Sequence, residues 1–211
     1  MAWTTPATAT AGSTALTAAF WNEQVKDNTQ ELYDRDGLIM IRPTSVAGTG
    51  VTLSNGKVSF SAASTISVNG CFSSSYDNYR IVISTTAGST SALFQMRMRA
   101  AGTDASGAST YSYSLLQSAS SGSWIVLDFS SGTTSHTVGY KQTANRASSS
   151  IDVYGPFEAT QTGLSITGHY ASVPYTGGGY HTVASSYDGF SILAATGDMT
   201  GSLRVYGYRN S

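Results

Sequence analysis

Histidines, acidic residues and cysteine are the side chains of this sequence that could support catalysis or hold a metal ion. The three histidines, His136, His169 and His181, lie far apart, and no His-x-x-x-His or Glu-x-x-His spacing joins them to a second ligand. The single cysteine, Cys71, excludes an intrachain disulfide framework and a cysteine-based zinc site. Burial as a small hydrophobic residue explains it. The sequence therefore predicts no metal site and no cofactor.

Glycan cleavage is the hydrolytic chemistry that remains open, because it needs only two carboxylates facing each other across a cleft. The acidic residues in the later part of the chain are Asp77, Asp104, Asp128, Asp152, Glu158, Asp188 and Asp198. Asp77, Asp104 and Asp188 stand within two residues of Gly, Ser or Asn, where turn geometry accounts for them without chemistry. The many serines include no Gly-x-Ser-x-Gly sequence of a nucleophile elbow. We therefore predict no catalytic residue and no enzyme, and we keep a cell-wall glycan depolymerase as a minor hypothesis.

Aromatic side chains around a run of three glycines are the best candidates for recognition of a ligand. The run Gly177-Gly178-Gly179 lacks the Lys-Ser/Thr of a phosphate-binding loop, and we interpret it as a flexible surface loop. Tyrosines on glycine-rich loops offer a large, rigid contact area, and aromatic faces stack on sugar rings, which suits a host cell-surface glycan. The alternative is that these side chains pack at strand ends or across a subunit interface. The candidate ligand-binding residues are His169, Tyr170, Tyr175, Tyr180 and His181.

Trp124 is a weaker second candidate for recognition. It follows the small polar stretch 118–123, but the apolar residues Ile125, Val126 and Leu127 come directly after it. That run predicts that Trp124 enters a strand of the core.

These candidates all lie in a part of the chain whose pattern is that of β-structure. From Leu38 onward, β-branched and aromatic segments alternate with Gly, Ser, Asn and Asp clusters at intervals of about ten residues. Apolar and polar residues alternate strictly over 94–99, so one face of that strand is expected in the core. The pair Asn55-Gly56 predicts a type I′ hairpin turn and hence antiparallel neighbours. No strand is followed by a crossover helix, so we predict an antiparallel β-sandwich of jelly-roll type over residues 38–211.

Residues 1–37 have a different pattern, which predicts an extended arm followed by one short helix. The arm alternates Thr and Ala, and the helix is predicted from Thr17, its N-cap, to about Arg35, with Gly37 behind it. A helix this short must pack on its own domain, on copies of itself or on another protein. We predict that this segment serves virion docking or oligomerisation, and both possibilities stay open. Its apolar anchors are Trp3, Pro6, Leu16, Trp21, Val25 and Leu32.

Charge and hydropathy exclude two classes of partner. Only 11% of residues are charged and the formal net charge is -1, against about 25% charged residues in a typical soluble domain. The basic residues are scattered along the chain, so no nucleic-acid partner is expected. No apolar run of membrane-spanning length and no signal peptide occur in the sequence, so no membrane insertion is expected.

The N-terminal stretch resembles the start of tail-associated proteins of tailed bacteriophages. Those proteins open with an Ala-Trp-Thr-x-Pro arm, a Thr-Ala-Gly turn and a Thr-capped helix that carries an Asp-Asn pair. The matching residues here are Trp3, Pro6, Thr10, Ala11, Gly12, Thr17, Asn22, Val25, Asp27 and Asn28. Phe20 departs from the pattern, since an acidic or polar residue is more usual there, which leaves the detail of docking open. The segments 60–84, 97–111 and 201–210 resemble the globular region of phage minor tail or fibre proteins, with a Tyr-Asp-Asn-Tyr turn at 76–79.

The resemblance implies a virion protein, assembled in the host cytoplasm with other phage virion proteins and usually as a homotrimer. In such proteins the N-terminus attaches to the particle and the β domain faces outward. Our main hypothesis is a tail-associated fibre or receptor-binding subunit that contacts the host surface. The alternative is a capsid decoration or head-fibre protein, in which the same anchor docks on the shell and the sandwich needs no ligand.

Overall fold

The computed structural model describes residues 22–27, 37–119 and 122–209, and the chain divides into two compact units, Met1–Gly37 and Leu38–Ser211. In the first unit, Asn22–Asp27 form a short π-helix, η1, within the segment where an α-helix was predicted. A π-helix closes i→i+5 hydrogen bonds and is a wider turn than the α-helix. Val25 is exposed on η1. The other predicted anchors lie outside the described residues, namely Trp3, Pro6, Leu16, Trp21 and Leu32.

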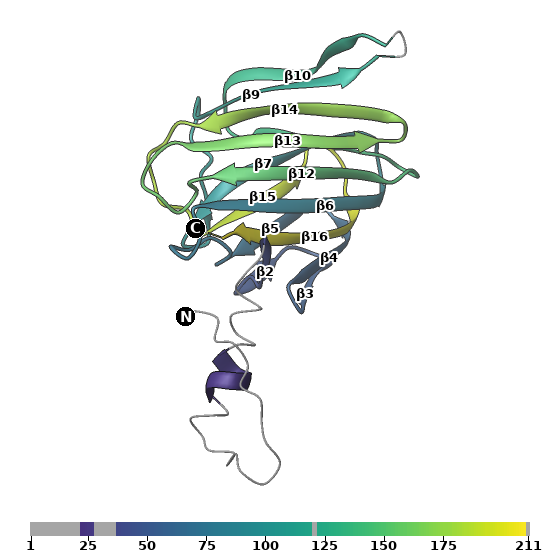
Figure 1. Cartoon of the computed structure of the whole chain (residues 1–211). Coiled ribbons are helices and arrows are strands. Elements are labelled where there is room, and N and C mark those ends of the chain that lie inside the picture. Colours follow the sequence, from purple (N-terminus) through teal and green to yellow (C-terminus); the bar gives the residue numbers. More distant parts are fainter. Residues whose placement is uncertain (1–21, 28–36, 120–121, 210–211) are drawn as a thin grey trace. The chain divides into compact units, whose positions relative to one another are not determined.

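The second unit is an antiparallel β-sandwich of two sheets, which confirms the predicted fold class (Figure 1). In the larger sheet the strands follow the order β10-β9-β14-β13-β12-β6-β16-β4-β3, and β1 also pairs with β16. Their bounds are β1 Leu38–Ile41, β3 Val51–Ser54, β4 Lys57–Ala63, β6 Asn78–Gly88, β9 Tyr111–Ser118, β10 Trp124–Thr133, β12 Ala147–Tyr154, β13 Thr162–Tyr170, β14 Val173–His181 and β16 Met199–Tyr208.

The smaller sheet has the order β11-β7-β15-β5-β2, with the short β8 beside β7. Its strands are β2 Ser45–Ala47, β5 Thr65–Asn69, β7 Ala92–Ala100, β8 Thr103–Asp104, β11 His136–Lys141 and β15 Gly189–Ala194.

The core lies between the two sheets and is built from alternate residues of each strand. On β7 the predicted alternation is confirmed, because Phe94, Met96 and Met98 are buried while the residues between them are only partly covered. On the larger sheet Ile81 and Ile83 of β6 are fully buried in the same cluster. Burial of each such side chain contributes about 1.5–3 kcal/mol to folding, so this interleaved layer holds the two sheets together.

The turn between β3 and β4 also follows the prediction. Asn55 and Gly56 have φ angles of 47° and 76°, and Ser54 pairs with Lys57 across them. Two successive positive φ angles are the mark of a type I′ turn, which side chains other than Asn and Gly rarely accept.

Strand β10 forms one edge of the larger sheet, and the prediction that Trp124 enters the core is wrong. Trp124 is 54% exposed, and Ile125 and Val126 are exposed as well. A strand at a sheet edge has a neighbour on one side only, here β9, so an apolar run there need not be buried.

Candidate functional site

The run Gly177-Gly178-Gly179 lies inside strand β14 and is paired on both sides, so its interpretation as a flexible loop is wrong. A Cβ added at Gly177 would lie 2.1 Å from the carbonyl oxygen of Ser114, and one added at Gly179 would lie 2.2 Å from that of Ser112. Glycine is therefore required here by the close approach of β9, not by chain freedom.

Because β14 is a strand, the residues that were predicted to surround a loop are distributed over both faces of the sheet. Tyr175 points into the core and is 2% exposed. Its hydroxyl is hydrogen-bonded to the Ser149 hydroxyl and donates to the Ser148 carbonyl at 3.1 Å. Burial raises the pKa of Tyr175 to about 12. Its position in the core removes it from any surface site.

His181 also points inward and is fully buried. Its ring stacks on Tyr111 at 4.1 Å between centroids, and its Nε2 lies 2.7 Å from the Tyr187 hydroxyl. Burial lowers the pKa of His181. The prediction of a surface role for Tyr175 and His181 is therefore wrong, since core packing accounts for both.

The remaining three predicted residues are not gathered into one site either. Tyr170 is partly buried against Tyr140, with ring centroids 4.3 Å apart, and its hydroxyl donates to Gln117. His169 is exposed on the outer face, with Nδ1 3.1 Å from the Ser148 hydroxyl. It pairs with Pro174, six residues from Tyr180 along β14, which is about 20 Å in a strand. Tyr180 thus remains as the exposed tyrosine on the outer face of β14.

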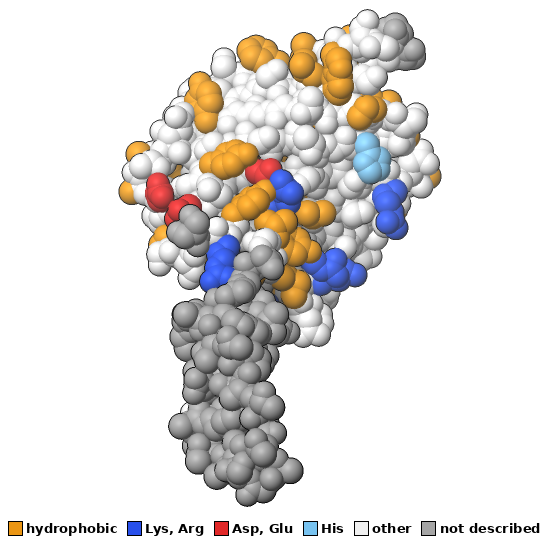
Figure 2. All heavy atoms as spheres, viewed as in Figure 1, with side chains coloured by type: hydrophobic (Ala, Val, Ile, Leu, Met, Phe, Trp, Pro, Cys, Tyr) orange, Lys and Arg blue, Asp and Glu red, His pale blue; other side chains and the backbone are white. Residues whose placement is uncertain are grey.

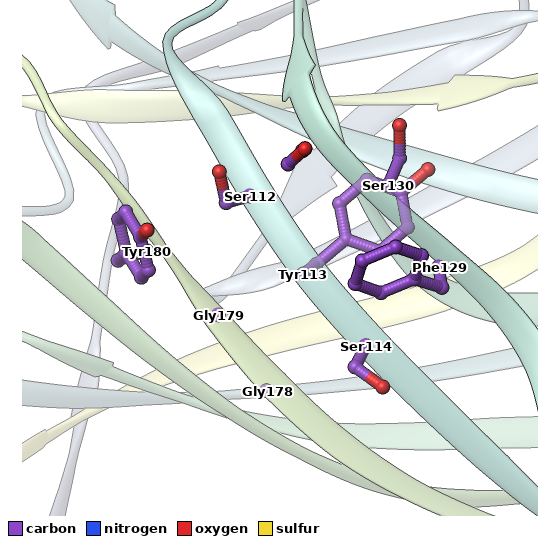
Figure 3. Close-up of a pocket in the computed structure, with 9 residues that line it drawn as sticks. Ser112, Tyr113, Ser114, Phe129, Ser130, Gly178, Gly179 and Tyr180 are labelled. Carbon is purple, nitrogen blue, oxygen red and sulfur yellow. The ribbon is translucent and has the colours of Figure 1, made fainter.

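Tyr180 forms one wall of a groove whose other wall is Phe129 of β10 (Figure 3). Tyr180 pairs with Ser112 of β9, and Phe129 pairs with Ser114 of the same strand, so β9 runs between the two rings. The rings are 43% and 66% exposed, respectively. The hollow measures about 310 Å³ and is lined by Ser112, Tyr113, Ser114, Phe129, Ser130, Ser131, Gly178, Gly179 and Tyr180.

Glycines occupy two outward-facing positions of this sheet, one in the groove and one between Tyr154 and Tyr180. Gly178 stands between Ser165 of β13 and Ser114 of β9 in the cross-strand register. Gly163 of β13 stands in the same way between Tyr154 of β12 and Tyr180. Because glycine has no side chain, the neighbouring rings project from the sheet surface at these positions.

Tyr154 extends the two walls into a row of three exposed aromatic rings, Tyr154, Tyr180 and Phe129, here called the aromatic row. Tyr154 is 44% exposed. Each member lies two strands from the next, on β12, β14 and β10. Strands lie about 4.8 Å apart, so the Cα atoms of Tyr154 and Tyr180 are about 10 Å apart, and those of Tyr180 and Phe129 about 12 Å. The aromatic row crosses the strands, and this outer face also carries other exposed apolar side chains (Figure 2).

A hydrogen-bonded polar cluster borders the aromatic row next to Tyr154. The guanidinium of Arg80 donates two hydrogen bonds to Asp152, at 2.7 and 2.8 Å, and the Tyr208 hydroxyl donates to the same carboxylate at 2.6 Å. Burial alone would raise the pKa of Asp152, but these hydrogen bonds outweigh it and hold that pKa below its usual range. Asp152 is therefore an ionised acceptor whose geometry is already set.

Other carboxylates are engaged in similar ways. Asp128 accepts hydrogen bonds from Tyr113 at 3.1 Å and from Thr137 at 2.6 Å, and Asp104 is paired with Arg99. Within the described ranges, no group of three or more His, Cys, Asp or Glu side chains is placed to hold a metal ion. Nor does that part of the chain contain a helix long and apolar enough to cross a membrane.

Sequence reasoning identified Tyr180 but missed Phe129 and Tyr154. The three residues are far apart in the chain, and only the strand order brings them into one row. A local signal for Phe129 does exist, because it stands between the polar residues Asp128 and Ser130. That signal does not say which face of the sheet the ring will occupy.

No protein-family model matches this sequence, and no curated protein matches it. Among solved structures, the chain is similar to domain 4 of AbnA, a GH43 extracellular arabinanase from Geobacillus stearothermophilus solved in complex with arabinotriose. The identity is 14% and the TM-score 0.34, over 82% of this chain and 83% of that one.

The chain is also similar to the CBM2 module of the evolved Dit of Lactobacillus casei BL23 phage J-1, at 14% identity and a TM-score of 0.31, over 80% of this chain and 92% of that one. A human SPRY domain matches at 8% identity and a TM-score of 0.32, over 77% of this chain and 97% of that one. These values describe a distant likeness and assign no function.

Proposed function

We propose that this protein binds an extended glycan of the host cell surface on the outer face of its larger sheet, as a tail-associated virion protein of a tailed bacteriophage. The observation that carries the binding function is the aromatic row. Its exposed rings are flanked by glycines and by serine hydroxyl groups. Binding without catalysis is the activity that we propose.

The chemistry of the groove suits a sugar ring. A pyranose has apolar C–H faces and a rim of hydroxyl groups, so it needs an aromatic surface on one side and small hydroxyl partners at its edge. Tyr180 and Phe129 supply the surfaces, and Ser112 and Ser114 between them can both donate and accept hydrogen bonds. The aromatic row continues beyond the groove to Tyr154 on β12, which favours a chain of sugars over a single terminal residue.

A protein partner is the competing use of exposed apolar side chains, because such patches often mark protein interfaces. A protein interface is expected to be well packed at its centre. Here Gly178 and the small side chains of Ser112 and Ser114 leave a hollow of about 310 Å³ beside Tyr180 and Phe129. That shape favours a ligand that inserts rings between the aromatic walls.

The virion part of the proposal rests on the resemblance of the N-terminal stretch to tail-associated phage proteins. A homotrimer attached to the particle through residues 1–37 belongs to the same proposal. Labelling of intact particles with an antibody against this chain tests the location. Label at the tail tip supports the proposal, whereas label over the shell supports the capsid decoration or head-fibre alternative.

Titration calorimetry with cell-wall glycan fragments of increasing length tests the binding site. We expect Tyr154→Ala, Tyr180→Ala and Phe129→Ala each to lower affinity about tenfold, which corresponds to the loss of one stacking contact. Phe157→Ala is the matched control, because Phe157 is an exposed aromatic residue outside the aromatic row. Unchanged affinity in all three variants, or an equal loss in the control, contradicts the proposed site.

A further inference from the structure

A second hollow, of about 450 Å³, lies on the outer face of the same sheet and has a different chemical character. Its lining combines three basic side chains with hydroxyl groups and contains no carboxylate. The lining residues are Lys57, Ser84, Thr86, Arg146, Thr200, Gly201, Ser202 and Arg204. On the right side of Figure 2, basic side chains lie on this face with no acidic side chain near them.

The strand register brings two of these cations side by side. Val58 of β4 pairs with Leu203 of β16 in an antiparallel ladder, so Lys57 and Arg204 come opposite each other at the next position. Both are exposed on the outer face. Like charges directly opposite each other in a sheet are destabilising. A neutral pair at these two positions would remove the repulsion. The presence of two cations there therefore indicates a functional role for their charges.

The third cation, Arg146, approaches from the other side of the hollow. It precedes Ala147, which pairs with Thr85 of β6, so Arg146 stands beside Thr86. Ion pairs among residues 22–27, 37–119 and 122–209 involve Arg80, Arg97 and Arg99, and none includes a cation of the hollow. In a chain with only 11% charged residues, three cations that have no carboxylate partner within the described ranges form a concentrated positive site.

The hydroxyl groups add hydrogen-bond donors to the hollow. Ser84 and Ser202 are paired across β6 and β16. Each hydroxyl adds one donor. Each of the two guanidinium groups can donate two parallel hydrogen bonds to a phosphate or a carboxylate, and the Lys57 ammonium adds a compact charge.

The basic hollow lies within reach of the aromatic row. Arg204 pairs with Val82, and Val82 pairs with Ser150, four residues before Tyr154 on β12. Two strand spacings and four residues along a strand give about 17 Å between the Cα atoms of Arg204 and Tyr154. A polymer of a few sugar units that lies on the aromatic row can therefore present a substituent to the hollow.

We propose that the hollow lined by Lys57, Arg146 and Arg204 binds an anionic group, a phosphodiester or a carboxylate, carried by the glycan that occupies the aromatic row. This inference rests on the proposed function and narrows it to anionic glycan polymers. The cations select the charged polymer, while the aromatic row binds its sugar rings.

The test compares the affinity of the full chain for four probes at low and high salt. The probes are a glycosylated poly(glycerol phosphate), a polygalacturonate, a neutral β-glucan of similar length and a single-stranded DNA oligonucleotide. We expect one or both anionic glycans to bind at least about tenfold more tightly than the neutral glucan at low salt. The preference should shrink as added salt shortens the Debye length from about 30 Å at 0.01 M towards about 8 Å at 0.15 M. The anionic glycan that binds more tightly identifies the anionic group.

Charge-removing variants assign the preference to the hollow. The double variant Arg146→Gln/Arg204→Gln should lose the preference for the anionic glycan and keep its affinity for the neutral glucan. Arg209→Gln is the matched control, because Arg209 is an exposed arginine just beyond the other end of β16 and should retain the preference. Lys57→Gln should weaken binding of the anionic glycan while its melting temperature stays equal or rises, since it removes the repulsion with Arg204. A loss of binding in that variant therefore cannot be assigned to misfolding.

Equal affinity for charged and neutral glycans, or a preference that survives in the double variant, overturns the inference while leaving the proposed glycan site intact. DNA binding as tight as that of the anionic glycans also overturns it, because the hollow would then recognise charge without sugar. Failure of the proposed function looks different, since binding of every glycan would then be insensitive to Tyr180→Ala and Phe129→Ala.

Discussion

Tyr175, Tyr180 and His181 stand in one strand, yet strand alternation places two of them in the core and one at the surface. The same rule places Phe129 on the outer face and its neighbour Asp128 inside, where it accepts hydrogen bonds from Tyr113 and Thr137. Whether a side chain can contact a ligand therefore depends on which face of the sheet it occupies. A tyrosine buried against Ser149 contributes to stability, whereas a tyrosine of the same strand beside Gly163 is available to a ligand.

His136 is the residue whose burial predicts a measurable pH dependence. Its ring is fully buried, Nδ1 donates to the Thr137 carbonyl at 2.8 Å, and Nε2 has no hydrogen-bond partner among the described residues. Burial lowers its pKa from 6.5 to about 4. Between these values the unfolded chain binds more protons than the folded one, so the free energy of unfolding should fall as pH falls from 6.5 to 4. The full effect is about 3 kcal/mol.

Chemical denaturation at several pH values measures this effect. His136→Gln should flatten the slope between pH 6.5 and 4, whereas His169→Asn, at an exposed position, should keep it. An unchanged slope in His136→Gln would show that another group titrates. His181, whose pKa is also lowered by burial, adds to the slope in the same direction and is present in both variants.

At the scale of the elements, one glycine in β13 and one in β14 serve two different purposes. At Gly177 the neighbouring strand β9 leaves no room for a Cβ, since the Ser114 carbonyl oxygen would lie 2.1 Å from it. At Gly163 an added Cβ would meet only ordinary contacts, 3.5 Å and beyond, with Tyr154. The first glycine therefore serves the packing of strands, and the second leaves the sheet surface flat between Tyr154 and Tyr180.

Two substitutions separate these roles. Gly177→Ala should lower the free energy of unfolding by about 1–3 kcal/mol, as overpacking does. Gly163→Thr should leave the free energy of unfolding within about 1 kcal/mol of the original, because a β-branched residue suits a strand. The same Gly163→Thr variant should bind the glycan several-fold more weakly, because its side chain stands between the two rings. Denaturant titration and calorimetry on the same samples check both outcomes, and a Gly163→Thr protein with full affinity contradicts the role of the flat surface.

At the scale of the whole molecule, the larger sheet carries the aromatic row and the basic hollow on one outer face, and its edge strand β10 exposes Trp124, Ile125 and Val126. An exposed apolar edge is a liability that proteins usually cover. Contact of β10 with a second copy of the chain would cover it, which is consistent with the proposed homotrimer.

Light scattering tests this assembly. The full chain should have a native mass near three times 22.0 kDa. Residues 38–211 alone should stay folded and trimeric, because they contain the described core cluster and retain β10. A trimer that is lost with residues 1–37 places the contacts in the N-terminal segment instead. Monomers in both cases contradict the trimer and favour the decoration-protein alternative.

The shortened chain should also fail to join particles, and its incorporation would contradict the docking role of residues 1–37.

The β class, the antiparallel turn at Asn55-Gly56 and the buried face of β7 follow from the sequence alone, because each depends on local periodicity or on the φ preferences of a residue pair. The structure of the run Gly177-Gly178-Gly179 does not follow from the sequence. A glycine run is compatible both with a loop and with a closely flanked strand, and only the flanking strands decide between them. The aromatic row is likewise a product of tertiary structure. Tyr154, Tyr180 and Phe129 come from separate hairpins, and only the long-range register of β12, β13, β14, β9 and β10 sets them on one face. Register is a property of strand pairs, so no single segment encodes it.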